Sequence, residues 1–491
     1  MSGRRTIPRG CGGWLTLRGK HLANPTSKTD DLAQTLRRQI AAGEFVAGDR
    51  LPSIRSLAAR HGLAKNTVIE AYDSLVASGE VEPRRGSGFY VRAVPASAAR
   101  EDEPNLLDRA MDTVWILREQ LNNDPAHLAI GHGIPPARWF DDARIERIRQ
   151  RFARGAPDAL FQYGHRFGHR PLRETLERRL HALGIVAPSN QILLTLGANE
   201  AMDLVVRGTM RPGDAALVDE PGYYPLYGKL ALHGVKAVGV PRQADGPNVD
   251  AFEQLAATSG ARTFFTQSIG HNPTGSDTSP AKAYRLLQIA ERHGITIVEN
   301  DAAGDLKPAG AMRLCTLDQL RRTVYIGSVT KTIGPALRVG FIAAEQGLVE
   351  RLADLKMLIH VSNPEYAERV VDAVLGSPEH PRFLASLHEQ VARETRHAVK
   401  ILTGLGAELF CVPTHSLYLW ARFPWAPDAL ALAKSLTKDQ IALAPGVFFL
   451  IDGRSPTEWS RFNTGYVVDP RFAKAMLKYR PASVAKTIGP V

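Results

Sequence analysis

The pattern of apolar residues changes near residue 106, and this change limits what the chain can fold into. Before it, apolar residues recur at helical spacing in short segments, whereas after it short strand-like runs alternate with helical segments. Such alternation predicts an α/β domain with a mainly parallel sheet. Residues 93–105 combine Ala, Pro, Ser and charged side chains, a composition typical of a linker. We therefore predict two folded units, residues 27–92 and 106–480, joined by that linker.

Composition places the chain among globular proteins. Its 491 residues suffice for a large core, and contents of 44% hydrophobic and 23% charged residues exclude a collagen or a wholly disordered chain. Cys11, Cys315 and Cys411 lie far apart, so the sequence predicts neither a disulfide framework nor a metal site. No apolar run reaches the ~18 residues of a membrane-spanning helix. We expect a cytoplasmic protein without a membrane partner.

Positive charge is concentrated at the N-terminal end. Residues 1–95 carry 15 Lys and Arg against 8 Asp and Glu, within a chain whose net charge is +11. A basic end predicts a nucleic-acid partner, but a solvated basic tail has the same charge. Residues 1–26, rich in Gly and Arg and without periodicity, are predicted to form a flexible basic arm.

Residues 27–92 predict three helices and a hairpin. The first helix is expected at 29–43, the second begins at Ser53, and the third runs from about residue 65 to residue 78. Two short apolar stretches around an Arg-Arg-Gly-Ser-Gly tip then predict a hairpin. Three helices followed by a basic hairpin are the pattern of a winged helix-turn-helix, whose third helix enters the major groove of DNA.

The same segment resembles the GntR-type winged helix. Its Leu-Pro-Ser-x-Arg, Asn-Thr-Val, Ala-Tyr-x-x-Leu and Arg-x-Gly-Ser-Gly elements fall in the order of that family over residues 28–92. The resemblance implies double-stranded DNA as a partner. The family usually has Ser-Arg where this chain has Ala64 and Lys65, which leaves the operator sequence open. The candidate DNA contacts, each of which could instead be an ordinary solvated side chain, are Ser53, Arg55, Lys65, Asn66, Thr67, Arg84 and Arg85.

The segment Gly-Ser-Val-Thr-Lys at residues 327–331 is the strongest chemical signal of the large unit. A strand is expected to end at Gly327, and Arg338 follows Lys331 by seven residues. This segment resembles the cofactor-lysine motif of fold type I aminotransferases. The resemblance implies that Lys331 forms a Schiff base with pyridoxal 5'-phosphate (PLP), while the Ser328 hydroxyl and Arg338 bind the phosphate.

Two further segments match the phosphate contacts of this fold. The sequence Thr-Leu-Gly-Ala-Asn-Glu places the backbone amides of Gly197, Ala198 and Asn199 at a predicted helix start, where backbone N–H groups bind anions. The sequence Phe-Gln-Tyr-Gly-His supplies Tyr163. In dimers of this fold that tyrosine reaches the phosphate held by the partner.

Three more segments match the ring and substrate contacts. The resemblance implies that Tyr223 stacks on the pyridine ring and that Asn272, in an Asn-Pro-Thr-Gly sequence, bonds to the ring hydroxyl. It also implies that Arg461 binds the α-carboxylate of an amino acid. Each short match is weak alone, and their common order along the chain carries the inference.

One strand departs from the family pattern. Where the family reads Glu-Asp-Asp-x-Tyr-Gly-Asp-Leu, this chain has Asn300 for the first Asp and Ala303 for the Tyr. The family's Asp keeps the pyridine nitrogen protonated, and an amide cannot stabilise that charge to the same extent. Asp301 could take over through a register change, which strand alternation disfavours. If the register is kept, Asn300 contacts the ring, and the protein is a poor transaminase unless a group elsewhere compensates for the lost carboxylate.

A winged helix joined by a linker to an aminotransferase domain is the architecture of MocR-type regulators, which the chain resembles over residues 28–470. The resemblance implies a homodimer with an amine or amino acid as effector. We predict a PLP-responsive transcription regulator whose large domain, of fold type I, is a weak or inactive transaminase. An active aminotransferase carrying a DNA-binding domain is the alternative, and a regulator that has abandoned PLP is a third. Whether the protein is an enzyme stays open.

Overall fold

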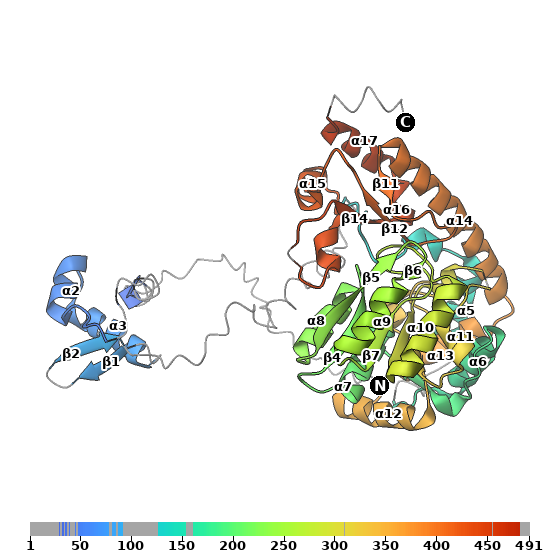
Figure 1. The fold of residues 1–491 in the computed structure, drawn as a ribbon, viewed down its shortest axis with the longest axis horizontal. Helices are drawn as coiled ribbons and strands as arrows, with labels where there is room; N and C mark the ends of the chain where they lie inside the picture. The colour runs from blue at the N-terminus through green and yellow to red at the C-terminus, as the bar shows by residue number, and fades with distance from the viewer. Residues whose placement is uncertain are drawn as a thin grey trace, which may run out of the picture. The chain divides into compact units, whose positions relative to one another are not determined.

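The computed structural model describes residues 48–77, 81–84, 87–91, 126–153, 161–308, 310–453 and 455–481, with scattered residues between 29 and 45. The predicted arm at 1–26, the linker at 93–105 and Arg85 lie outside the described residues. The chain divides into two compact units, one within residues 1–103 and one within residues 104–491 (Figure 1). Each unit is described by itself below.

Most of the helix predicted at 29–43 lies outside the described residues. The described part of the N-terminal unit contains two helices and a hairpin, in the order predicted for a winged helix. Ser53 caps the first of them, since its Oγ accepts a hydrogen bond from the Ser56 amide, and Gly62 ends it at φ +63°. The hairpin strands are antiparallel and pair Val81 with Val91. The elements are α2 (Ile54–His61), α3 (Lys65–Ala77), β1 (Val81–Arg84) and β2 (Gly88–Val91).

This unit has a hydrophobic core of its own. One face of α3 supplies Val68, Tyr72 and Leu75, which are fully buried. The Tyr72 hydroxyl donates to the Pro52 carbonyl at 2.5 Å, and its ring stacks on Phe89 of the hairpin at 4.5 Å. The hairpin is therefore fixed to the helix that precedes it. Further buried members of this core are Leu32, Ala33, Leu36, Leu51, Leu57, Ala58, Ala71, Val81 and Val91.

The large unit is built on an eight-stranded sheet with the order β3-β10-β9-β8-β7-β4-β5-β6. Strands β4, β5, β7, β8 and β9 run parallel, as the alternating sequence predicts, whereas β10 is antiparallel to both of its neighbours. The sheet is therefore mixed. Its strands are β3 (Ile192–Thr195), β4 (Ala215–Glu220), β5 (Lys236–Gln243), β6 (Gly246–Pro247), β7 (Thr263–Thr266), β8 (Thr296–Asp301), β9 (Thr323–Ser328) and β10 (Gly340–Ala343).

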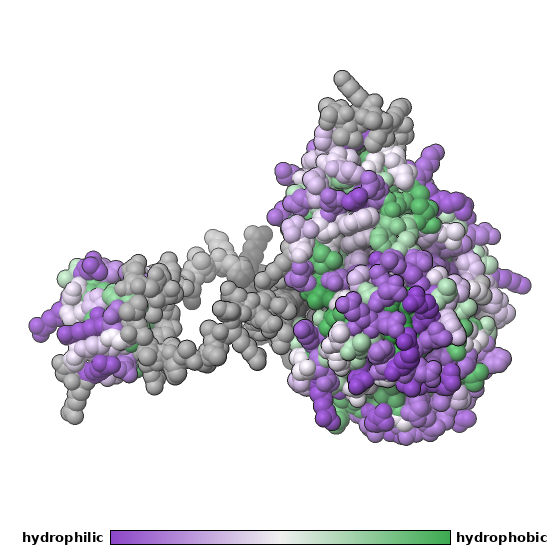
Figure 2. Space-filling model, in the orientation of Figure 1, coloured by the Kyte–Doolittle hydropathy of each residue, from purple (hydrophilic) through white to green (hydrophobic). Residues whose placement is uncertain are grey.

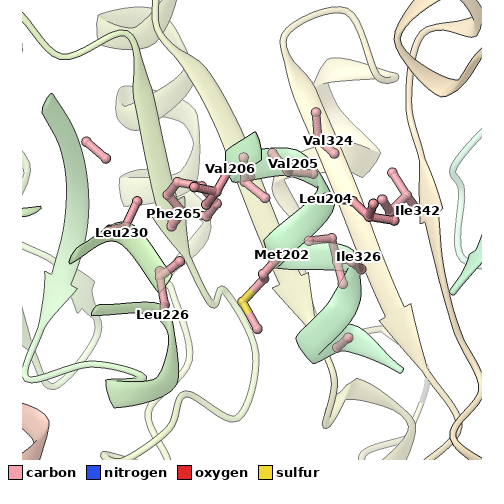
Figure 3. Close-up of a cluster of buried hydrophobic side chains, with 14 of the residues drawn as sticks. Met202, Leu204, Val205, Val206, Leu226, Leu230, Phe265, Val324, Ile326 and Ile342 are labelled. Carbon is pink, nitrogen blue, oxygen red and sulfur yellow. The ribbon is translucent and has the colours of Figure 1, made fainter. Parts of the chain in front are cut away.

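Helices cover both faces of this sheet (Figure 1). Successive residues of a strand belong to opposite faces: Phe265 packs in the cluster with α7 and α8, while Phe264 packs with Phe252 of α9 on the other side. Figure 3 shows α7 with Met202 and Val205 against strand side chains such as Ile326. The covering helices are α5 (Ala143–Ala153), α6 (Arg170–Ala182), α7 (Ala198–Thr209), α8 (Tyr224–Leu232), α9 (Val249–Thr258), α10 (Pro280–His293), α11 (Leu314–Asp318), α12 (Gln346–His360) and α13 (Glu365–Leu375).

The outer surface of the covering helices is polar. In Figure 2 hydrophilic side chains gather over the region of α9 and α10. In α10 the buried positions Ala283, Leu286 and Ile289 face the sheet, while Arg285 and Arg292 are exposed. Amphipathic helices of this kind bury one apolar stripe against the sheet and leave the other in water.

The C-terminal part of the large unit is a small sheet with its own helices. The strands are antiparallel in the order β11-β12-β14-β13, and Leu128 adds a parallel bridge to Ile441. The central position of β14 places Arg461 opposite Trp420 of β12. The elements are α14 (His380–Gly404), β11 (Glu408–Leu409), β12 (Tyr418–Arg422), α15 (Ala429–Leu436), β13 (Ala444–Pro445), β14 (Trp459–Asn463), α16 (Thr464–Val467) and α17 (Pro470–Tyr479).

Short 3-10 turns join several of these elements. They are η1 (Ala137–Trp139), η3 (Ser189–Gln191), η4 (Gly304–Leu306), η5 (Pro335–Leu337), η6 (Thr437–Asp439) and η7 (Gly446–Phe449). Within the described ranges no helix is both long and apolar enough to cross a bilayer. The same ranges contain no cluster of three His, Cys, Asp or Glu side chains able to hold a metal ion.

Candidate functional site

Lys331 lies in the turn after β9, at an edge of the central sheet. Its Nζ donates a hydrogen bond to the Gly133 carbonyl. Burial of the amine, with repulsion from Arg461 and Arg338, lowers its pKa to about 7. Near neutral pH a large share of this amine is therefore uncharged, and the uncharged amine is the form that attacks a carbonyl carbon.

The start of α7 forms an anion cradle beside this lysine. Gly197 precedes the helix at φ +81°, and a Cβ at this position would lie 2.9 Å from Nη2 of Arg338. That Nη2 donates to the Leu196 carbonyl at 2.8 Å. A Cβ on Gly340 of β10 would lie 2.6 Å from the carbonyl carbon of Gly197. The two glycines thus let a guanidinium and the free amides of a helix N-terminus converge, as a phosphate requires.

The predicted residues of this cradle are brought together. Ala198 and Asn199 form the first turn of α7 after Gly197. Ser328 ends β9, and its buried Oγ donates to Oγ1 of Thr330 at 2.8 Å. Arg338 itself adopts φ +53°, an uncommon conformation for a side-chain-bearing residue. Strained backbone of this kind persists where the surrounding structure fixes it, often at binding sites.

Arg461 and Asn272 are in direct contact. Nη1 of Arg461 donates to Oδ1 of Asn272 at 2.8 Å, and Nε and Nη2 donate to the Gly131 carbonyl. The guanidinium is fully buried over the rings of Tyr418 and Phe449, at 5.0 and 4.8 Å. Arg461, predicted to bind a carboxylate, and Asn272, predicted to bond to the ring hydroxyl, are 189 positions apart and lie in one site.

Tyr223 and Asn300 line a small cavity of about 20 Å³ at the ends of β4, β7 and β8. Asn300 is buried, and its Nδ2 donates a weak hydrogen bond to the Sδ of Met202 at 3.7 Å. The cavity also contains Leu226, Asp219 and His271. Apart from Asp219, the groups around the Asn300 amide are uncharged or apolar.

Asp301 lies on the opposite side of β8. Its Oδ2 accepts hydrogen bonds from Nε of Arg313 and from the Tyr325 hydroxyl, both at 2.6 Å. The register change that would bring Asp301 to the cavity is absent from the structure. Strand alternation is the reason, because neighbouring residues point to opposite faces. Ala303 is buried next to Gly270 and has no hydroxyl to offer.

Sequence reasoning missed a buried ionic cluster at the cavity. Oδ2 of Asp219 accepts hydrogen bonds from Arg242 Nη1 (2.9 Å), Thr266 Oγ1 (2.8 Å) and the Gln267 amide (3.2 Å). Burial raises the pKa of Asp219, but the Arg242 guanidinium and the hydrogen bonds outweigh it, so the pKa lies below its usual value. Burial and Arg242 lower the pKa of His271 to about 4, which makes it neutral. No local motif marks this cluster, since its members come from separate strands and loops.

The segment at residues 131–133 was also missed as a site element. The Gly131 carbonyl accepts a hydrogen bond from Arg461, and the Gly133 carbonyl accepts one from Lys331. A Cβ on Gly131 would lie 2.3 Å from the Ala444 amide nitrogen, so only glycine fits there. The sequence offered one signal, the Gly-His-Gly pattern, whose contact partners lie about 200 and 330 residues away.

Tyr163 lies apart from these contacts, with 84% of its surface exposed. The segment that carries it packs against the end of α12, because a Cβ on Gly164 would lie 3.1 Å from the Asn363 carbonyl. Within one chain the structure therefore does not bring Tyr163 into the cavity.

In the N-terminal unit, exposed polar side chains gather at the start of α3. Lys65 and Asn66 are exposed, Thr67 is half-buried, and Arg55 on α2 is exposed. No acidic residue occupies the first turn of α3. Arg84 is held by Glu82 at 2.8 Å and lies over the Tyr90 ring at 4.4 Å, which sets its place on the hairpin.

Comparison with known proteins identifies both units. Residues 135–468 match the aminotransferase class I and II family, and residues 28–91 match the bacterial regulatory proteins of the gntR family. A probable rhizopine catabolism regulatory protein, MocR of Rhizobium meliloti, is 32% identical over 331 residues, 65% of this chain and 66% of that protein. The uncharacterized HTH-type transcriptional regulator YdcR of Escherichia coli is 26% identical over 450 residues, 89% of this chain and 95% of that protein.

Solved structures share the fold of the large unit. The α-aminoadipate aminotransferase LysN of Thermus thermophilus, complexed with N-(5'-phosphopyridoxyl)-L-leucine, superposes with a TM-score of 0.67 at 22% identity. That match covers 74% of this chain and 94% of LysN. A kynurenine aminotransferase of Pyrococcus horikoshii gives the same TM-score at 20% identity, over 79% of this chain and 98% of that one.

The large unit thus has the fold type I aminotransferase architecture that the sequence predicts, with a mixed central sheet. The chain belongs to the aminotransferase class I and II family and carries a gntR-type helix-turn-helix domain in front of it, the arrangement of MocR-type regulators.

Proposed function

We propose that this protein is a cytoplasmic, PLP-responsive transcription regulator. The proposal depends on Lys331, whose lowered pKa leaves much of its amine uncharged beside the anion cradle of α7 and Arg338. The same chain also contains a gntR-type helix-turn-helix domain. When bound, PLP supplies an aldehyde that captures amines and a ring that can draw electrons from them. The residues of the site fit this group in charge and in donor type.

Each part of the cofactor has a chemical counterpart in the chain. The Lys331 amine would bind the aldehyde carbon, and the amides of α7 with Arg338 would bind the phosphate. Tyr223 and Asn272 orient the ring, and Arg461 holds a carboxylate. An amino acid or amine that competes with Lys331 for the aldehyde would release the lysine, so such molecules are the effector class.

Sensing rather than turnover is favoured by the cavity around Asn300. A carboxylate there would stabilise a protonated ring nitrogen, but an amide carries no charge to do so. Ala303 supplies no hydroxyl, and Asp301 is committed to Arg313 on the other face of β8. We propose that the large domain is a weak or inactive transaminase. An active aminotransferase remains the second candidate, because Lys331 and Arg461 are both in place.

We further propose a homodimer through the surface at the end of α12. Apolar side chains are exposed there, and the adjoining 161–164 segment adds two aromatic rings. Exposed clusters of this kind mark interfaces, and a partner's Tyr163 would then reach the phosphate site. The side chains are Phe161, Tyr163, Met357, Leu358, Ile359 and Val361. Leu358→Asp, at the most exposed of the α12 positions, is expected to give a monomer by light scattering.

In the DNA-reading domain, the first turn of α3 is proposed to meet base edges in the major groove. Lys65, Asn66 and Thr67 supply the donors and acceptors, while Arg55 and Arg84 contact the backbone. The roles of Ser53 and Arg85 in DNA binding are part of the same proposal. A Lys65→Ala, Arg55→Ala double variant is expected to lose operator binding, and unchanged affinity would contradict it.

The test of the cofactor begins with an absorption spectrum of the purified protein with added PLP. We expect a visible band that borohydride abolishes and that Lys331→Ala lacks, and an operator affinity that changes when PLP is added. No band in either protein would contradict PLP binding. Rapid transamination of ordinary amino acids would instead favour the second candidate.

A further inference from the structure

Two buried oxygen atoms at the small cavity beside Tyr223 and Asn300 have no hydrogen-bond partner in the described part of the chain. They are Oδ1 of Asp219 and Oδ1 of Asn300. Both side chains are more than nine-tenths buried, and both line the same cavity of about 20 Å³. Unpartnered buried polar atoms are costly, so a pair of them in one cavity calls for a donor between them.

The two oxygens cannot satisfy each other. Oδ1 of Asp219 belongs to an ionised carboxylate, since Arg242 and the hydrogen bonds on Oδ2 hold its pKa low, and an ionised carboxylate only accepts. The carbonyl oxygen of Asn300 also only accepts. A cavity of this size holds one water molecule, and a water has two hydrogens to donate. One water within hydrogen-bond distance of both oxygens would satisfy both atoms.

Such a water decides which way the Asn300 amide faces. With its oxygen committed to the water, the amide must turn its Nδ2–H bonds away from Asp219. The structure has Nδ2 beside Met202 Sδ, a weak acceptor at 3.7 Å, so these donors are still available. A ring nitrogen that meets an N–H donor must accept through its lone pair, and so it carries no proton.

We propose that Asp219 is a positioning residue of the cofactor pocket: through one bound water it holds the Asn300 amide as a hydrogen-bond donor to the ring nitrogen, which stays unprotonated. This inference rests on the proposed binding of PLP and explains why the pocket would capture amines but convert them poorly. The negative charge is on Asp219, whereas the family has it at the position of Asn300.

The first arm of the test needs no cofactor. A high-resolution crystal structure of the unliganded full-length protein is expected to show one water within hydrogen-bond distance of both Oδ1 atoms. A cavity with no water, or an Asn300 amide whose nitrogen faces Asp219, would overturn the proposal.

The second arm uses PLP labelled with ¹⁵N in the ring and follows the ¹⁵N chemical shift by NMR. The wild-type protein is expected to show the shift of an unprotonated pyridine nitrogen, and Asn300→Asp the shift of a protonated one. Asp219→Asn is expected to release PLP about tenfold more readily, as the loss of one fixed hydrogen bond predicts. A protonated nitrogen in the wild type would overturn the inference while the borohydride-sensitive band upheld PLP binding; absence of that band would count against the proposed function itself.

A matched control separates positioning from structural damage, because Asp219 also anchors Arg242. Ser276 accepts from Nε of Arg242 at 3.0 Å and lies outside the cavity, so Ser276→Ala disturbs the same cluster without touching the free oxygen. This variant is expected to retain the wild-type ¹⁵N shift and PLP retention. If Ser276→Ala and Asp219→Asn behave alike, Asp219 acts only through the stability of the cluster and the proposal fails.

Discussion

At the scale of single residues, the site depends on groups whose chemistry burial has altered. Lys331 is the main case, because burial and two neighbouring guanidinium groups lower its pKa to about 7. An ordinary lysine would be almost fully charged at neutral pH and unable to attack an aldehyde. The same shift has a consequence for stability that can be measured without any ligand.

As pH rises between about 7 and 10, the unliganded protein should gain more stability than Lys331→Met, which still contains Lys356 with a pKa lowered to about 8. In this range the unfolded lysine, with an ordinary pKa of ~10.4, still binds a proton that the folded amine has lost, so folding becomes more favourable with rising pH. Well below pH 7 both states hold the proton, and the difference in stability from Lys331→Met is constant. Thermal unfolding of both proteins across this range checks the prediction, and parallel curves would contradict it.

Ser53 allows a separate test of structure and of DNA contact. Its Oγ caps α2, so Ser53→Ala should lower the stability of the N-terminal unit by about 1 kcal/mol. Ser53→Asp keeps a capping oxygen but adds a negative charge where a DNA phosphate is expected, so stability should be retained while operator affinity falls. Unfolding and fluorescence anisotropy are the measurements. Wild-type affinity in Ser53→Asp would place Ser53 away from the DNA.

At the scale of elements, the end of α12 is tied to the start of α7. Nδ1 of His360 lies 3.1 Å from Oε1 of Glu200, whose other oxygen accepts from the Leu196 amide. Nε2 of His360 contacts Asn363 at 3.1 Å. The carbonyl of the same Leu196 binds Arg338. The anion cradle and the exposed surface of α12 thus share a hydrogen-bond network.

A strained turn follows His360 at Val361, which is itself a member of this surface. Val361 adopts φ +66° and ψ −68°, and the Ser362 amide donates to the His360 carbonyl at 2.7 Å, which makes a γ-turn. A β-branched residue at positive φ is an outlier. Val361→Gly should therefore stabilise the protein by roughly 1 kcal/mol in spite of the entropy of glycine, whereas Val361→Ala, which keeps a Cβ, should gain less. Denaturant unfolding checks both, and a destabilised glycine variant would show that the turn is not strained.

At the scale of the whole molecule, the two units have separate cores. The N-terminal unit buries its own cluster around Tyr72, and the large unit is built around the central sheet. A unit with its own core can fold and bind by itself. Any response of DNA binding to PLP must therefore come from the large unit, through assembly or through the linker.

This division predicts how fragments and variants bind DNA. The isolated segment 27–92 should bind the operator at least a hundredfold more weakly than the full chain, because the proposed dimer would join two DNA-binding domains and raise their effective concentration. Its affinity should not change with PLP. Full-length Lys331→Ala should keep strong binding but lose the PLP response. Electrophoretic mobility shifts at fixed salt test all three, and a PLP response in Lys331→Ala would contradict the role of this lysine.

The sequence by itself determined the features that depend on neighbouring residues. Helical spacing and turn residues predicted α2, α3 and the hairpin, and contiguous motifs that resemble those of fold type I aminotransferases predicted the lysine turn and the glycine before α7. Strand alternation also favoured Asn300 over Asp301 as the residue of the cavity. In each case the physical cause lies within a few residues of the chain.

The tertiary structure alone decided the features that join distant residues. β10 was not predicted as a strand and runs antiparallel, since its pairing with β3 and β9 is set by a chain reversal that no periodicity records. Asp219, Arg242 and His271 meet only because parallel strands end at one edge of the sheet. The carbonyls of Gly131 and Gly133 reach Arg461 and Lys331 across hundreds of residues. Hydrogen bonds between segments so far apart depend on packing, which a linear pattern does not encode.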